Sequence, residues 1–94
     1  MSPDQNVRRM VWKFPLAIED VQAIPMPADA DLLFVAVQHD QLYLWARVIP
    51  TSETRPREII IRGTGQPIWQ QPYIGSALMA DGSLVWHVFD GGEQ

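Results

Sequence analysis

The chain has 94 residues, of which 47% are hydrophobic, with no cysteine and a formal net charge of −4. This length allows one domain, expected over 1–94 with flexible ends at 1–9 and 90–94. Because cysteine is absent, disulfides and thiolate metal sites are excluded, and a reducing cytoplasm is the simplest compartment. The dispersed acidic residues argue against duplex nucleic acid as a partner, and no apolar run is long enough to span a membrane.

The N-terminal third predicts one strand that bends and then ends at a pair of prolines. Residues 10–16 are mostly apolar, and 21–24 continue the strand beyond the bend. Pro25 and Pro27 are expected to force a turn, because proline lacks the N–H that a central strand needs. This turn divides an N-terminal arm from the main sheet.

The next two apolar runs predict a hairpin. Residues 32–38 are nearly all apolar, which predicts a strand buried on both faces. A short polar connection at 39–41 joins this strand to a second one over 42–49. Alternation in the second strand places four aliphatic side chains on one side, namely Leu42, Leu44, Ala46 and Val48.

The middle of the chain contains one strand between two loops. A polar loop over 50–56 precedes a strand over 57–62, which runs into the turn Gly63-Thr64-Gly65. Residues 66–72 include two prolines and fit neither the helical nor the strand period. They predict an ordered loop that is held by Trp69.

The C-terminal third predicts a second hairpin. Its strands cover 73–79 and 84–89, and Asp81-Gly82 between them tolerates the positive φ of a tight turn. The tail at 91–94 is expected to fray. No stretch shows sustained helical spacing of apolar residues, so the whole pattern predicts an all-β fold, a small antiparallel sandwich or barrel of about six short strands.

The turn after the strand over 57–62 is the main candidate for binding chemistry. Two glycines beside a threonine hydroxyl allow a sharp bend with exposed backbone N–H groups, and arginine offers a forked donor for phosphate or carboxylate. The candidate anion site consists of Arg55, Arg57, Arg62, Gly63, Thr64 and Gly65. Neither a P-loop nor a dinucleotide fingerprint is present, so a purely structural turn is the alternative.

Two further side chains complete the candidate ligand site. Alternation along its strand places His87 on the same face as Val85 and Phe89. The alternative to a ligand-binding role is a core or interface histidine that is bonded to a backbone carbonyl. Trp69 is the aromatic residue expected to stack on a nucleobase, while most other aromatics should simply pack. With two histidines and scattered carboxylates, we expect no metal site, no cofactor and no catalytic set.

Several short motifs run in order along about 11–89, namely Trp12-Lys13-Phe14, Met26-Pro27, Val35 to Gln38, Leu44-Trp45-Ala46, Gly63-Thr64-Gly65, Tyr73-Ile74-Gly75 and His87-Val88-Phe89. In order and spacing this set resembles a family of short, functionally uncharacterised phage and prophage proteins. The resemblance implies a phage accessory protein in the cytoplasm of a bacterial host, and it carries no assigned activity. By analogy, small phage proteins of this kind often counter host immunity.

Four functions follow from these observations, in order of preference. The first is a homo-oligomer that sequesters a small phosphate-bearing signal of the cyclic-nucleotide class without turnover. The second is a protein–protein inhibitor of a bacterial defence complex, similar to an anti-CRISPR protein, which uses acidic residues and exposed aromatics. A phage structural or assembly protein is the third. Nucleotide hydrolysis comes last because no catalytic set is recognisable, so the protein is not expected to be an enzyme.

Overall fold

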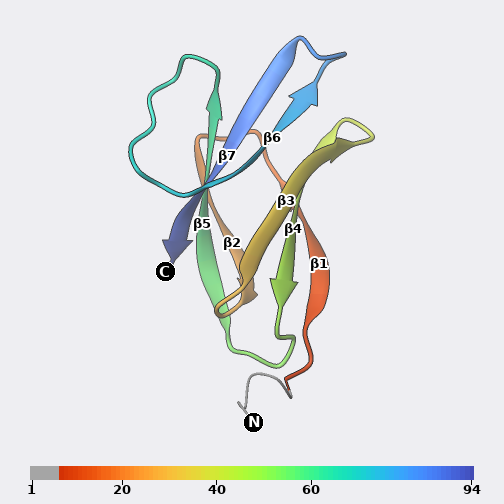
Figure 1. Ribbon diagram of the computed structural model, residues 1–94, viewed down its shortest axis with the longest axis vertical. Coiled ribbons are helices and arrows are strands. Elements are labelled where there is room, and N and C mark those ends of the chain that lie inside the picture. The colour runs from red at the N-terminus through yellow and green to blue at the C-terminus, as the bar shows by residue number, and fades with distance from the viewer. Residues whose placement is uncertain (1–6) are drawn as a thin grey trace.

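The computed structural model describes residues 7–94 and shows seven strands and no helix among them (Figure 1). The strands are β1 (Met10–Leu16), β2 (Val21–Pro27), β3 (Asp31–Gln38), β4 (Gln41–Val48), β5 (Thr54–Gly63), β6 (Tyr73–Met79) and β7 (Leu84–Glu93). They form two antiparallel sheets with a shared core, which confirms the predicted all-β sandwich. Residues 1–6, most of the N-terminal stretch expected to be flexible, lie outside the described residues.

The three-stranded sheet has the order β1-β4-β3 and contains the first predicted hairpin, which is confirmed. β3 and β4 are joined through His39 and Asp40, whose φ angles of 50° and 62° suit a primed two-residue turn. The four side chains predicted to share one side of β4, from Leu42 to Val48, are each at most 1% exposed. Alternation therefore identified the core face of this sheet.

β3 is buried on one face only, so the prediction of a strand buried on both faces is wrong. Its exposed side chains include Leu33 and Phe34, which are 44% and 57% exposed. β3 is an edge strand of a fold with only two layers. Its outer face therefore has no third layer to pack against.

The four-stranded sheet has the order β2-β5-β7-β6, and β2 overturns the prediction of a turn at the two prolines. β2 does not continue β1 but belongs to the other sheet, and Pro25 and Pro27 both lie within it. Because β2 is an edge strand, the missing N–H of a proline can face away from its partner. The turn follows at 28–29, where Asp29 has a φ of 61°.

The loop between β5 and β6, teal in Figure 1, is held by backbone carbonyls and not by Trp69. The Trp69 side chain is 72% exposed, so the prediction that it holds the loop is wrong. The carbonyl of Pro67 accepts a 2.9 Å hydrogen bond from Arg62. The carbonyl of Pro72 accepts a 2.8 Å hydrogen bond from the N–H of Asp90.

The C-terminal hairpin of β6 and β7 is confirmed, with β6 as predicted, but β5 and β7 are longer than predicted. β7 continues to Glu93, and the N–H of Gln94 donates a 2.8 Å hydrogen bond to the carbonyl of Pro56. The tail that was expected to fray is therefore paired. β5 begins at Thr54, which shortens the polar loop predicted over 50–56.

The core lies between the two sheets and consists of hydrophobic side chains. The largest fully buried ones come from both sheets and are Leu16, Leu42, Leu44, Val48, Ile59 and Val88. No polar or charged side chain among residues 7–94 is buried. Groups that could bind a ligand or a partner therefore lie on the outer faces, at the strand edges and in the loops.

Candidate functional site

The Gly63-Thr64-Gly65 turn forms at the end of β5, as the sequence predicts. The carbonyl of Gly63 accepts a 3.1 Å hydrogen bond from the N–H of Gln66. Gly65 has a φ of 94°, which glycine adopts without steric cost. The N–H of Gly63 donates to the side-chain oxygen of Gln66, so one backbone donor expected to face an anion is already bonded.

Arg62 is bonded to three backbone carbonyls. Its Nε donates to Pro67 at 2.9 Å, and its Nη1 donates to Asp20 at 3.1 Å and to Ile61 at 3.0 Å. The guanidinium thus ties the end of β5 to the β1–β2 connection and to the β5–β6 loop. A guanidinium has five N–H donors, and these three bonds use the Nε donor and both Nη1 donors. The two donors of Nη2 are left for a ligand.

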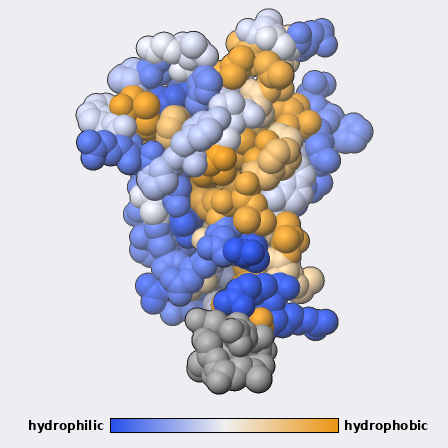
Figure 2. All heavy atoms as spheres, in the orientation of Figure 1, coloured by the Kyte–Doolittle hydropathy of each residue, from blue (hydrophilic) through white to orange (hydrophobic). Residues whose placement is uncertain are grey.

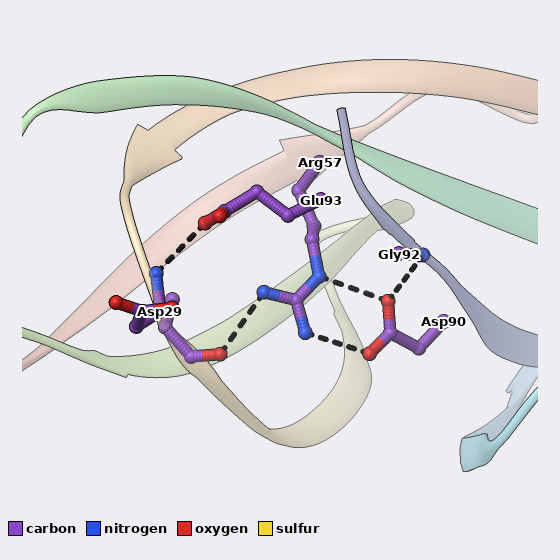
Figure 3. A network of polar contacts seen from close by, with 6 residues as sticks. Asp29, Arg57, Asp90, Gly92 and Glu93 are labelled. Atoms are coloured by element: carbon purple, nitrogen blue, oxygen red, sulfur yellow. Dashed lines mark hydrogen bonds and ion pairs between the residues drawn. The ribbon is translucent and has the colours of Figure 1, made fainter.

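Arg57 and Asp90 form a two-point ion pair, shown in Figure 3. Arg57 Nε lies 2.9 Å from Asp90 Oδ1 and Nη2 lies 2.7 Å from Oδ2, and the two side chains are only 13% and 17% exposed. Arg57 also donates to the carbonyl of Ala30 at 3.1 Å, and the N–H of Gly92 donates to Asp90 at 2.8 Å. We call these four residues the arginine clamp, which joins β5, β7 and the segment between β2 and β3.

The arginine clamp shifts the pKa of both its charged members. The hydrogen bond from Arg57 holds the pKa of Asp90 below its ordinary value, and the same bond raises the pKa of Arg57. Glu93 adds a contact beside the pair, because its carboxylate accepts a 2.8 Å hydrogen bond from the N–H of Asp29. The charge of Arg57 is thus neutralised inside the protein and is not presented to a ligand.

The predicted convergence of the three arginines on the glycine turn does not occur. Arg55 donates to Glu53 at 3.1 Å on the exposed surface, and this hydrogen bond raises the pKa of Arg55. Arg57 and Arg62 are five positions apart in β5, so they lie on opposite faces, roughly 17 Å apart at ~3.4 Å per residue. Each arginine is bonded to an acceptor of its own.

The structure does bring together Thr64 and His87. Thr64 Oγ1 lies 2.9 Å from His87 Nε2, Ser76 Oγ lies 2.8 Å from His87 Nδ1, and Tyr73 Oη lies 2.6 Å from Ser76 Oγ. His87 is therefore bonded to hydroxyls and not to a backbone carbonyl, the alternative considered from the sequence. Since hydroxyls take both ring nitrogens, no nitrogen is left for the carboxylate of a nucleophile–base–acid triad.

Ser76 and Tyr73 were missed as neighbours of His87. For Ser76 the signal was present, because pairing the predicted hairpin symmetrically about its turn places Ser76 opposite His87, as in the structure. For Tyr73 it was absent. A register shift between Tyr73 and Gly75 moves this residue along the strand, and a bulge is not visible in the apolar pattern.

Sequence reasoning also missed a surface where β3 and β6 approach each other from different sheets. Figure 2 shows apolar residues gathered in a band down the middle of this view, with hydrophilic residues on both sides. The close approach is visible at Gly75, where an added Cβ would lie only 3.0 Å from Val35 Cγ2. We call the exposed side chains of these two strands the apolar face, namely Leu33, Phe34, Tyr73 and Leu78.

Phe34 is held in place by other aromatic side chains. Its ring centroid lies 5.6 Å from that of Trp45, and Trp45 lies 6.0 Å from Tyr43. Lys13 Nζ lies 4.3 Å from the centre of the Tyr43 ring, which is a cation–π contact. These tilted ring contacts favour one arrangement, so Phe34 is exposed and preorganised at the same time.

Trp69 and the glycine turn line different hollows. Trp69 lines an open hollow of about 580 Å³ together with Gln70, Gln71, Pro72, Asp90, Gly91 and Gly92. Thr64 lines a different hollow, which it shares with residues 83–86. The predicted ligand residues therefore do not form one site.

Neither a metal centre nor a spanning helix is found in the described part of the chain. Within residues 7–94, no three histidine, aspartate or glutamate side chains are grouped to hold a metal ion. None of these residues forms a helix long and apolar enough to cross a membrane.

The comparisons with known proteins give a family but no activity. No curated protein and no solved structure matches this chain. The arginine clamp, the His87 contacts and the apolar face all fall within the part of the chain that matches a family. Residues 7–94 match the family described as a domain of unknown function (DUF7352), and the chain belongs to that family.

Proposed function

We propose that this protein is a non-catalytic binding protein whose apolar face docks on another protein. The observation that carries the proposal is the 57% exposure of Phe34, a large ring on an ordered strand. Burial of such a ring favours association, and a few aromatic anchors usually dominate the binding free energy of an interface. Preorganisation by Trp45 reduces the entropy lost when the ring is buried.

Other exposed apolar side chains lie on β3 and on the adjacent β6, and charged residues lie at one end of β3. Single exposed apolar residues are ordinary, but a contiguous patch over adjacent strands marks interaction sites. Leu33 is exposed beside Phe34 on β3, and Tyr73 and Leu78 are exposed on β6, the strand that lies next to β3. At one end of β3, Arg47 pairs with Asp31 at 2.9 Å, with side chains that are 52% and 56% exposed. An apolar centre with charged residues at its margin is the usual anatomy of an interface.

The resemblance to phage and prophage proteins supplies the setting for this proposal. In that setting the partner is a bacterial defence complex or a virion component, met in the host cytoplasm. The cations Lys13 and Arg47 lie on the outer face of the same sheet as Phe34. Docking by aromatic anchors therefore fits this surface better than acidic mimicry of a nucleic acid.

The test compares Phe34→Ala with Val21→Ala. Val21 is also apolar and 49% exposed, but it lies on β2, the edge of the four-stranded sheet that is distant from β6. Affinity capture with the tagged protein identifies the partner, and calorimetry with purified partner then measures each variant. We expect Phe34→Ala to weaken binding by about tenfold or more, as for an interface anchor. Equal affinities for Phe34→Ala and the unaltered protein would refute the proposal.

Sequestration of a phosphate-bearing nucleotide by a homo-oligomer, without turnover, is the second candidate. It is favoured by the 2.9 Å contact of Thr64 with His87 beside the glycine turn and by the Nη2 end of Arg62. A ligand that binds only the native state raises the melting temperature. Thermal shifts with a panel of cyclic nucleotides, together with the molar mass in solution, test this candidate. Unchanged melting temperatures for the whole panel would remove it.

A further inference from the structure

We propose that the hollow around Trp69 binds the flat, uncharged ring of a nucleobase. Its volume of about 580 Å³ falls within the usual range of small-molecule sites. The β5–β6 loop and the end of β7 both contribute to its lining. No residue of the apolar face lines it, although Tyr73 directly follows Pro72, so this site is distinct from the protein-docking surface.

The first element of the site is the Trp69 ring, which is 72% exposed. The loop that carries it is bonded on both sides of the ring, at the carbonyls of Pro67 and Pro72. An exposed indole on a loop with two such bonds is a ready surface for stacking. Any nucleobase can stack on an aromatic side chain, whatever the nucleotide sequence, because every base has a π-face.

The second element is a stretch of lining without side chains, formed by Gly91 and Gly92. A Cβ at Gly91 would lie 2.6 Å from Glu58 Cγ, and Gly92 has a φ of 98°. These glycines follow from an irregularity in the pairing of β5 with β7, at Glu58 and Ile59. The place of a Gly91 side chain is filled by Glu58, whereas a Cβ at Gly92 would have nothing within 4 Å, so it is at Gly92 that the backbone of β7 stays open to a flat ligand.

The third element is the charge balance of the hollow, which selects an uncharged group. Asp90 is the only charged residue of the lining, and its carboxylate is bonded by Arg57 and by the N–H of Gly92. Since this charge is already neutralised, the hollow favours neither a cation nor a phosphate. The phosphate of a bound nucleotide would point to solvent.

The fourth element is hydrogen bonding by the side-chain amides of Gln70 and Gln71. An amide both donates and accepts, as does the edge of a nucleobase. Among the described residues, the buried Oε1 of Gln71 has no hydrogen-bond partner. Leaving a covered acceptor without a partner costs free energy. Because this atom is covered, a ligand N–H reaches it only once the Gln71 side chain turns into the hollow, and the bond then formed removes that cost.

The experiment follows the indole N–H signals of the four tryptophans by NMR during titration. The probes are the common ribonucleoside monophosphates and a short single-stranded RNA. We expect a saturable shift of the Trp69 signal. In calorimetry, Trp69→Ala should lower the affinity by about 5- to 150-fold, the equivalent of base–aromatic stacking, and Gln71→Leu should lower it as well. Binding of the monophosphates identifies a free nucleotide as the source of the base, and binding of the RNA alone identifies a strand.

Phe34→Ala is the matched control, an exposed aromatic residue outside the hollow. It should bind the probes as the unaltered protein does. No Trp69 shift at millimolar concentrations of every probe would overturn the inference, as would an unchanged affinity in Trp69→Ala. Neither result would refute docking through the apolar face, because docking on a partner protein depends on Phe34.

Discussion

Replacing Asp90 by asparagine should lower the free energy of unfolding by about 1.5–3 kcal/mol, the range for a lost hydrogen bond to a charged group. The substitution keeps the shape of the side chain and its Oδ1 acceptor. It removes the negative charge and the 2.7 Å contact that Oδ2 accepts from Arg57. Because the two side chains are only 13% and 17% exposed, water cannot replace the lost interaction with the guanidinium.

Asp31→Asn is the matched control for this prediction. Arg47 also donates two hydrogen bonds to Asp31, at 3.1 and 2.9 Å, but these side chains are 52% and 56% exposed. We expect a loss below about 1 kcal/mol, as for other surface pairs. Urea unfolding of the unaltered protein and both variants at neutral pH gives the comparison. Equal losses would refute the argument that burial makes the Asp90 pair the stronger one.

The same carboxylate sets a pH dependence with a definite sign. Arg57 holds the pKa of Asp90 below its ordinary value, so the unfolded state binds a proton at a pH where the folded state does not. The resulting stability is complete above the unfolded pKa of about 3.9 and is lost as the pH falls through the lower folded pKa. The advantage of the unaltered protein over Asp90→Asn should therefore shrink below about pH 4. An advantage that grows in acid would contradict this account.

Two further substitutions test how the loop and the strand end are built. In Arg62→Lys one ammonium cannot serve the three carbonyls, so the free energy of unfolding should fall by about 1 kcal/mol and hydrogen exchange in 64–72 should accelerate. Unchanged exchange would mean that these bonds do not hold the loop. Gly91→Ala should cost about 1–3 kcal/mol in urea unfolding because of its contact with Glu58. Adding Glu58→Gly, which also removes the Cβ at 2.8 Å, should recover part of that loss in a double-mutant cycle, and no recovery would exclude crowding as the cause.

Local patterns were sufficient for the strands and the fold class, but not for the place of each strand in a sheet. In β4, alternation separates aliphatic from polar or aromatic residues, and a strand with one buried face must show this period. The prolines of β2 misled the prediction, because a local pattern does not show whether a strand is central or at an edge. β3 misled it too, since an apolar run fits both a doubly buried strand and an exposed binding surface.

The candidate site was predictable only where one hairpin or one turn determines it. Thr64 and His87 meet because β5 pairs with β7, which places Arg62 opposite His87 across a long sequence separation. The arginines did not converge because nearness in sequence is not nearness in space. Alternation sends Arg57 and Arg62 to opposite faces of β5, and their acceptors are set by the tertiary fold. No local pattern shows that Asp90 or the Pro67 carbonyl will lie beside them.

The distribution of cations and aromatic rings favours contact through exposed rings over the grip of an anion. Arg57 and Arg62 are bonded to acceptors inside the protein, whereas Phe34 and Trp69 are 57% and 72% exposed. Burying a phenylalanine side chain contributes roughly 1.5–3 kcal/mol, a large amount for a domain whose size makes it marginally stable. Phe34 and Trp69 do not contribute this stabilisation to the fold, because they stay exposed on ordered segments. Their apolar surface is therefore available for a contact with another molecule. Because no residue of the apolar face lines the hollow around Trp69, Phe34→Ala and Trp69→Ala should each weaken one kind of contact and leave the other intact.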